Sequence, residues 1–304
     1  MSKRKPGRRR MTGREARRAM ARRTVAVLPT LLTLGNAVCG FAAITFAGRW
    51  TGFEPDTSLF VAACLIFMAM VFDALDGSAA RRLKQTSEFG AQLDSLCDAI
   101  SFGVAPALLM LQLAAGFHPR LLWLIAALYV ACVVLRLARY NVEADDTPSD
   151  RSFTGLPSPA AAGTVASVPL MVYGVKSLDI SPDNFVLGEF AGHIDWLAAR
   201  LLPVMTLAIA FLMVSRVRFP NTFHDVVRGR KNGGHVIKVV FAVAIIFVLP
   251  QIVVPLLFGW YAFATPVAAL WNRRKPPADA PDTAPAVADA PPSPAAGPDA
   301  DGPG

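Results

Sequence analysis

The sequence predicts an all-α fold, a polytopic integral membrane helix bundle with about eight transmembrane helices. Two observations predict this class. Hydrophobic residues make up 54% of the 304 residues and charged residues only 17%, and the mean hydropathy is +0.43, so the chain is too apolar for an ordinary soluble domain. The apolar residues also gather in runs close to the roughly 20 residues that a helix needs to cross a bilayer.

The first 23 residues carry the positive charge of the chain. They hold eleven Lys and Arg against Glu15, so the net charge of +8 falls to about −2 without them. An apolar run of spanning length follows directly, so we interpret this segment as a cytoplasmic orientation signal that contacts anionic lipid, and expect no nucleic-acid partner. That run is long for a signal peptide and lacks a clear small-x-small cleavage site, which favours a first transmembrane helix.

Six apolar runs have the length of a transmembrane helix, and they cover residues 25–47, 58–75, 93–115, 120–139, 158–175 and 196–214. A further apolar stretch, 235–271, would be roughly 55 Å long as one helix, which is too long for one span. We divide it near residues 250–255, where two prolines interrupt the helical pattern. This division gives the seventh and eighth spans.

The distribution of Lys and Arg predicts the orientation of the bundle. If the N-terminus is cytoplasmic, the basic loops and the C-terminus are also cytoplasmic, whereas the outside loops 51–58 and 176–195 are poor in Lys and Arg. The inside loop 141–155 is the exception, because it is mostly acidic. The segment after residue 275 is rich in Pro, Ala, Asp and Gly and is predicted to be disordered. The predicted parts are a basic tail (1–24), a six-helix membrane core (25–219), a loop with two extra spans (220–272) and a disordered cytoplasmic tail (273–304).

Acidic and small residues follow one another at helical spacing near the ends of the second and third predicted helices. One stripe, spaced i, i+3, i+4 and i+7, consists of Asp73, Asp76, Gly77 and Ala80. A second stripe, spaced i, i+4 and i+8, consists of Gly90, Asp94 and Asp98. The loop between the helices is short, so the stripes can face each other and bring four carboxylates into one volume.

Four carboxylates in one small volume repel each other, so either some are protonated or divalent cations lie among them. Oxygen ligands without His or Cys favour Mg²⁺, Mn²⁺ or Ca²⁺ over zinc. Mg²⁺ commonly recruits substrate phosphates, which indicates phosphoryl-type chemistry with one or two ions. The small residues Gly77, Ala80 and Gly90 leave room for a nucleotide, and Arg81 can pair with a phosphate oxygen.

The full pattern, D-x2-D-G-x2-A-R-x8-G-x3-D-x3-D over residues 73–98, resembles the signature of the CDP-alcohol phosphatidyltransferase family at all eight fixed positions. The resemblance implies a membrane enzyme that transfers a substituted phosphate from a CDP-linked donor to an alcohol and releases CMP. It implies that Asp73, Asp76 and Asp94 are ligands of Mg²⁺ or Mn²⁺ and that Asp98 is both a ligand and the general base. The CDP pocket would be shaped by Gly77, Ala80, Arg81 and Gly90.

Four further segments, at residues 30–44, 135–141, 153–163 and 212–220, resemble the bacterial members of this family that use serine as the acceptor. In the first segment, Thr33 and Asn36 lie one helical turn apart and could hydrogen-bond either the nucleotide or a neighbouring helix. Gly35 and Gly40 are expected to permit close helix packing. The resemblance implies phosphatidylserine as the product and a bacterial cell (inner) membrane as the location, in which the distribution of Lys and Arg predicts that both termini are cytoplasmic.

The serine carboxylate needs a cation or N–H donors, and Arg136, Arg139 and Arg151 lie at the same membrane edge as the acids. We select Arg139 and Asn141, together with Arg136, as the acceptor site. The alternative is that these arginines only anchor the helix at the membrane surface. Arg216 and Arg218 also have two interpretations. They either bind a phosphate of the donor or acceptor, or they anchor the chain at the membrane surface.

The partners that we expect are CDP-diacylglycerol, L-serine, the lipid bilayer and a second copy of the chain in a homodimer. Another acceptor, such as glycerol 3-phosphate or an inositol phosphate, is the alternative within the family, and it would demand a denser basic pocket. A divalent-cation transporter is the alternative from another class. Transport would place the acids near the bilayer midplane, whereas here they gather at one face.

Overall fold

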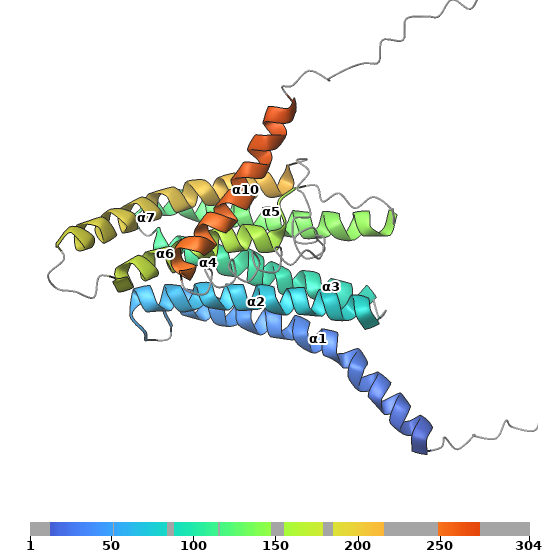
Figure 1. Ribbon diagram of the computed structural model, residues 1–304. Coiled ribbons are helices and arrows are strands. Elements are labelled where there is room, and N and C mark those ends of the chain that lie inside the picture. Colours follow the sequence, from blue (N-terminus) through green and yellow to red (C-terminus); the bar gives the residue numbers. More distant parts are fainter. Residues whose placement is uncertain are drawn as a thin grey trace, which may run out of the picture.

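The computed structural model describes residues 13–50, 52–83, 88–114, 116–146, 155–178, 185–215 and 249–273. Within these ranges every regular element is a helix, as the sequence predicts (Figure 1). The elements are α1 (Gly13–Ala47), α2 (Pro55–Leu83), α3 (Glu88–Asp98), the π-helical segment η1 (Ala99–Val104), α4 (Ala105–Leu113), α5 (Pro119–Asp146), α6 (Ser158–Leu178), α7 (Phe185–Val214) and α10 (Pro250–Arg273).

Six stretches of the described helices are long and apolar enough to cross a membrane, and they correspond to the first six predicted spans. They cover Pro29–Ala47, Pro55–Ala79, Glu88–Leu113, Pro119–Val142, Ser158–Ser177 and Gly192–Val214. Large apolar side chains also point away from the bundle, among them Trp123 and Trp260, which are 70% and 78% exposed. Apolar side chains exposed on this scale indicate contact with lipid, so the chain is a multi-pass membrane protein.

The predicted division of the stretch 235–271 coincides with the start of α10 at Pro250. The helix then continues through Pro255 without ending. The run of α10 whose side chains are described, Pro250–Ala264, is apolar but shorter than a membrane span, and residues 235–248 lie outside the described part of the chain. The total of eight spans therefore stays a prediction.

Helix α6 lies at the centre of the bundle, where it contacts α2, α7 and α10. In its spanning part 78% of the residues are buried, compared with 28–56% in the other five spans. Small buried residues such as Ala161 and Ala162 allow neighbouring helices to approach. At Gly163, a Cβ atom would lie 2.3 Å from the ring of Phe258, so this glycine is needed for α10 to cross α6 as seen in Figure 1.

The third span is not one uniform α-helix, which the sequence analysis did not foresee. It begins at Glu88, five residues before the predicted start, and it widens into η1 directly after Asp98. Pro106 explains the widening, because its ring lacks an N–H and would clash with the carbonyl of Phe102 four residues earlier. The backbone hydrogen bonds there join residues five positions apart, because the Ala105 N–H donates to the Ile100 carbonyl.

The turn before α6 is fixed against the end of α7. Gly155 has a positive φ of +87°, which side-chain-bearing residues rarely adopt, and a Cβ there would lie 2.3 Å from the Met213 carbonyl oxygen. The next residue, Leu156, donates its backbone N–H to the Leu212 carbonyl at 3.2 Å. This turn places the first residue of α6, Ser158, in the interior of the bundle.

An ion-pair group joins three helices at one end of the bundle. Lys176 of α6 lies 2.9 Å from Asp56 of α2 and 2.5 Å from Asp195 of α7. Asp56 begins α2, whereas Asp73 and Asp76 lie 17 to 20 residues further along the same helix, about 25–30 Å away. The ion pairs and the acidic stretch therefore occupy opposite ends of the bundle.

Candidate metal and nucleotide site

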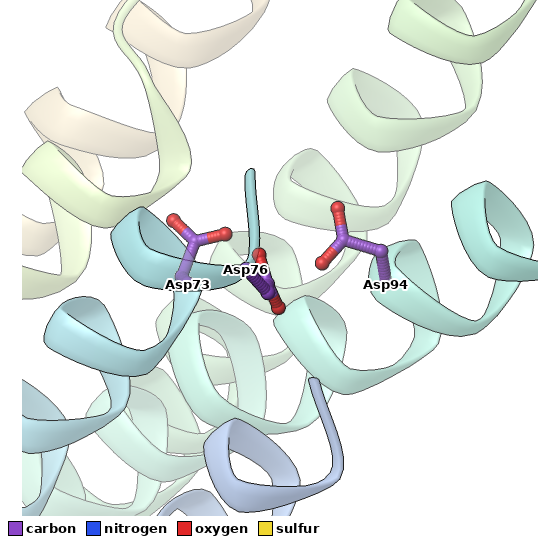
Figure 2. A group of neighbouring side chains, drawn as sticks. All are labelled: Asp73, Asp76 and Asp94. Carbon is purple, nitrogen blue, oxygen red and sulfur yellow. The ribbon is translucent and has the colours of Figure 1, made fainter. Parts of the chain in front are cut away.

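Three of the predicted carboxylates converge between α2 and α3. Asp73 and Asp76 lie on successive turns near the end of α2, and Asp94 faces them from α3 (Figure 2). Each offers a carboxylate oxygen, and these three oxygens lie within 4.8 Å of one another. The helical spacing that placed the acids on facing stripes is confirmed for these three residues.

Oxygen atoms of this cluster are buried without a partner of their own. Asp76 Oδ2 and Asp94 Oδ1 are inaccessible to solvent and have no hydrogen-bond partner among the described residues. Like-charged carboxylates this close repel each other, and a buried oxygen without a partner costs free energy. A divalent cation would remove both costs, and an all-oxygen donor set suits a hard cation. The residues present therefore fit a divalent metal.

Asp98 lies outside the group of three. It is 7% exposed and ends α3, and its Oδ1 accepts a hydrogen bond of 2.9 Å from Asn36 Nδ2 on α1. It still interacts electrostatically with Asp73 and Asp94. Of the four carboxylates predicted to converge, three form the cluster, and Asp98 lies beside them and is bound to α1.

Gly77 has open space beside it among the described residues. A Cβ atom built at this residue meets nothing within 4 Å, although Gly77 follows the buried Asp76 directly. Gly90 lies on α3 in the half-buried part of the same region. Ala80 and Arg81 continue α2, but their side chains lie outside the described structure, so their predicted contact with CDP is not placed.

The two polar residues of α1 face the acids. Thr33 lies beside Asp76, and its hydroxyl donates a hydrogen bond of 3.0 Å to the Pro29 carbonyl. Of the two alternatives for Asn36, contact with a neighbouring helix is present through Asp98. Close helix packing at Gly40 is also confirmed, because a Cβ there would lie 2.2 Å from Ser101 Oγ.

The three predicted acceptor residues on α5 differ in their surroundings. Arg136 donates from Nη1 to the buried Ser158 hydroxyl at 2.6 Å and interacts electrostatically with Asp73 and Asp98. Asn141 exchanges hydrogen bonds with Ser95, at 2.9 and 3.3 Å, one residue from Asp94. Arg139 has an exposed side chain. Arg151, Arg216 and Arg218 lie outside the described residues.

Sequence reasoning missed the side chains that hold this site in place. Ser158 and Ser95 bind the acceptor candidates, Ser101 binds the Asn36 carbonyl on α1, and Tyr129 binds the Phe102 carbonyl in η1. One of them carried a signal in the sequence, because a serine directly before a proline is typical of a helix N-terminus, where Ser158 lies. The others are ordinary residues in apolar runs.

The fold and the site together define a multi-pass membrane protein with an acidic site of metal-binding character at one end of its bundle. The family model for CDP-alcohol phosphatidyltransferase matches residues 26–188, more than half of the chain. The chain therefore belongs to the CDP-alcohol phosphatidyltransferase family, a family of transferases that use divalent cations.

Relatives with assigned names resemble this chain over most of the bundle. An archaetidylserine synthase of Methanothermobacter thermautotrophicus is 35% identical over 195 residues, which cover 64% of this chain and 69% of the relative. A CDP-diacylglycerol–serine O-phosphatidyltransferase of Helicobacter pylori is 30% identical over 236 residues, 77% of this chain and 87% of the relative. A protein of that name from Mycobacterium tuberculosis is 39% identical over 140 residues, less than half of either chain.

Proposed function

We propose that this chain transfers the phosphatidyl group of CDP-diacylglycerol to L-serine, producing phosphatidylserine and CMP. The observation that carries the proposal is the cluster of Asp73, Asp76 and Asp94 beside the open space at Gly77, in a chain that belongs to the CDP-alcohol phosphatidyltransferase family. The names of the relatives support serine as the acceptor.

Asp73, Asp76 and Asp94 would hold the cation, Mg²⁺ or Mn²⁺, through carboxylate oxygens. A cation bound there would supply positive charge against the donor pyrophosphate and the departing phosphate of CMP. The role of Asp98 as a further ligand stays a prediction, because its Oδ1 is bound by Asn36.

Asp98 serves as the general base in this proposal. It accepts the proton of the serine hydroxyl while the serine oxygen forms a bond to the phosphatidyl phosphorus. The bond between that phosphorus and the bridging oxygen of CDP breaks, and CMP leaves with the electron pair. The substitution needs no covalent intermediate on the enzyme.

The nucleotide half of the donor is proposed to lie along α2 and α3. Gly77 leaves space for it, Ala80 and Gly90 add no bulk, and Arg81 pairs with a phosphate oxygen. Thr33 completes this side of the pocket from α1, where it lies beside Asp76.

Arg136 is the residue that we favour for the serine carboxylate. Its guanidinium reaches the interior, where it is fixed by Ser158, and it interacts with Asp98, the proposed base. A guanidinium offers several donors in a fixed plane, so one edge can bind Ser158 while another binds the carboxylate. Asn141 and Arg139 lie further along α5 and would line the entrance to the serine site.

The remaining proposals concern the arrangement of the chain. We assign residues 25–219 to the catalytic core and propose a bacterial cell membrane with both termini cytoplasmic, which the distribution of Lys and Arg and the bacterial relatives support. A homodimer stays a prediction.

The test is CMP release by the purified protein in detergent micelles that contain CDP-diacylglycerol and Mn²⁺, with serine, glycerol 3-phosphate or an inositol phosphate added in separate reactions. We expect release only with serine, transfer of labelled serine into lipid, and loss of both after chelation. Release only with a phosphorylated acceptor would replace serine by that acceptor. An Asp94→Asn variant that turned over like the wild type would overturn the assignment of the site.

A further inference from the structure

The contact between Asn36 and Asp98 joins two spans that are 62 residues apart in the sequence. Asn36 is fully buried and Asp98 is 7% exposed. A carboxylate can only accept, so the hydrogen bond of 2.9 Å requires Asn36 Nδ2 as the donor and fixes the orientation of the amide. The amide oxygen, Asn36 Oδ1, is then left buried without a partner among the described residues.

The unpaired oxygen of Asn36 lowers the stability of the folded protein. A buried amide that satisfies only one of its two ends loses free energy through desolvation of the other end. An apolar residue of the same size would avoid that cost. The contact with Asp98 is therefore the one gain that the described structure gives this side chain.

The backbone around this pair is held from both sides. Ser101 of η1 donates its hydroxyl to the Asn36 carbonyl at 2.9 Å, and the absence of a side chain at Gly40 lets η1 approach α1 this closely. On the other side, the fully buried Tyr129 of α5 donates its hydroxyl to the Phe102 carbonyl at 3.0 Å. Pro106 cannot donate to that carbonyl, so Tyr129 supplies the missing donor.

We infer that Asn36, Ser101 and Tyr129 form a positioning network for Asp98, with Asn36 orienting the carboxylate and the other two fixing the π-helical segment that follows it. The inference rests on the proposed function, in which Asp98 is the base. By occupying Oδ1, Asn36 leaves Oδ2 as the oxygen available to the acceptor hydroxyl.

The test compares Asn36→Leu and Tyr129→Phe with the wild type in detergent micelles. We expect Asn36→Leu to lower kcat about 10- to 100-fold, the loss caused by small misplacement of a reacting group, while KM for serine, binding of CDP-diacylglycerol and Mn²⁺ affinity by calorimetry stay within about twofold. The melting temperature should stay close to that of the wild type, because the substitution removes one unpaired buried oxygen, Asn36 Oδ1, and leaves another, Asp98 Oδ1, without its donor. Tyr129→Phe should lower kcat about fivefold, as expected for one neutral hydrogen bond.

Matched controls separate this role from general damage to the bundle. Tyr173→Phe removes a hydroxyl from a tyrosine that stacks on Phe60 in α2, and Thr206→Val removes a buried hydroxyl that binds the Leu202 carbonyl within α7. Both variants should keep the wild-type kcat.

Three outcomes would overturn the inference while leaving the proposed function intact. Unchanged kcat in Asn36→Leu would show that Asp98 needs no orientation. A raised KM for serine alone would make Asn36 an acceptor contact, and lost binding of CDP-diacylglycerol would make it a nucleotide contact. A wild-type protein that released no CMP with serine would instead contradict the proposed function.

Discussion

Arg136 Nη1 donates a hydrogen bond of 2.6 Å to the hydroxyl of Ser158, which joins α5 to the first residue of α6 inside the bundle. Ser158 is 1% exposed, so the guanidinium is drawn inward, toward Asp98 and Asp73. Arginines near a helix end commonly extend to the membrane surface. Arg136 does not, and this distinguishes it from Arg139, whose side chain is exposed.

The first prediction concerns this arginine. Arg136→Lys keeps the charge but loses the planar set of donors, so we expect KM for serine to rise about tenfold with little change in binding of CDP-diacylglycerol. Arg120→Lys, at the opposite end of the same helix, is the matched control and should change KM less than twofold. Steady-state rates over a serine titration measure both, and equal effects of the two substitutions would contradict the role of Arg136.

The second prediction uses two glycines with opposite surroundings. Gly77→Ala places a methyl group where no described atom beyond its own stretch of helix lies within 4 Å, so the melting temperature should not change while the affinity for CDP-diacylglycerol falls. Gly40→Ala places a methyl group 2.2 Å from Ser101 Oγ, so it should destabilise the bundle. If Gly77→Ala bound the donor as tightly as the wild type, the nucleotide would not lie against this part of α2.

The third prediction concerns the carboxylates with unpaired oxygens. Asp76→Asn and Asp94→Asn should each lower Mn²⁺ affinity at least about tenfold, because each removes a charged ligand. In the absence of metal, both variants should melt at or above the wild-type temperature, since repulsion within the cluster is relieved. Calorimetric titration with Mn²⁺ and thermal unfolding in a chelator measure the two effects. Lower stability without metal would indicate that the acids are held by protein contacts instead.

The fourth prediction concerns the opposite end of the bundle. Lys176→Met breaks the ion pairs with Asp56 and Asp195, which are 50% and 40% exposed at their side chains. Exposed pairs contribute at most about 1 kcal/mol, which corresponds to a fall of about 2–4 °C in melting temperature. The difference from the wild type should shrink in high salt, and kcat should be unchanged because the site lies at the other end of α2.

Much of this architecture could be predicted because it follows from local spacing. The length of apolar runs determined the first six spans, and the i, i+3 and i+4 pattern brought Asp73, Asp76 and Asp94 together. What could not be predicted depends on contacts between distant spans. The separate place of Asp98 is set by Asn36, and the widening at η1 combines a local cause, Pro106, with a distant donor, Tyr129. Nothing in the local pattern predicts that Arg136 reaches the interior, because its partner there, Ser158, lies on another helix.

The most direct measurement is incorporation of labelled serine into lipid by the wild type and by Asp98→Asn, with Mn²⁺ and CDP-diacylglycerol present. Asparagine can still accept the hydrogen bond from Asn36, so the variant should fold and should keep most of its affinity for the donor lipid. The account predicts serine-dependent lipid formation by the wild type and a fall of at least about 100-fold in Asp98→Asn, the range expected for a lost general base. Turnover of Asp98→Asn near the wild-type rate would contradict the account.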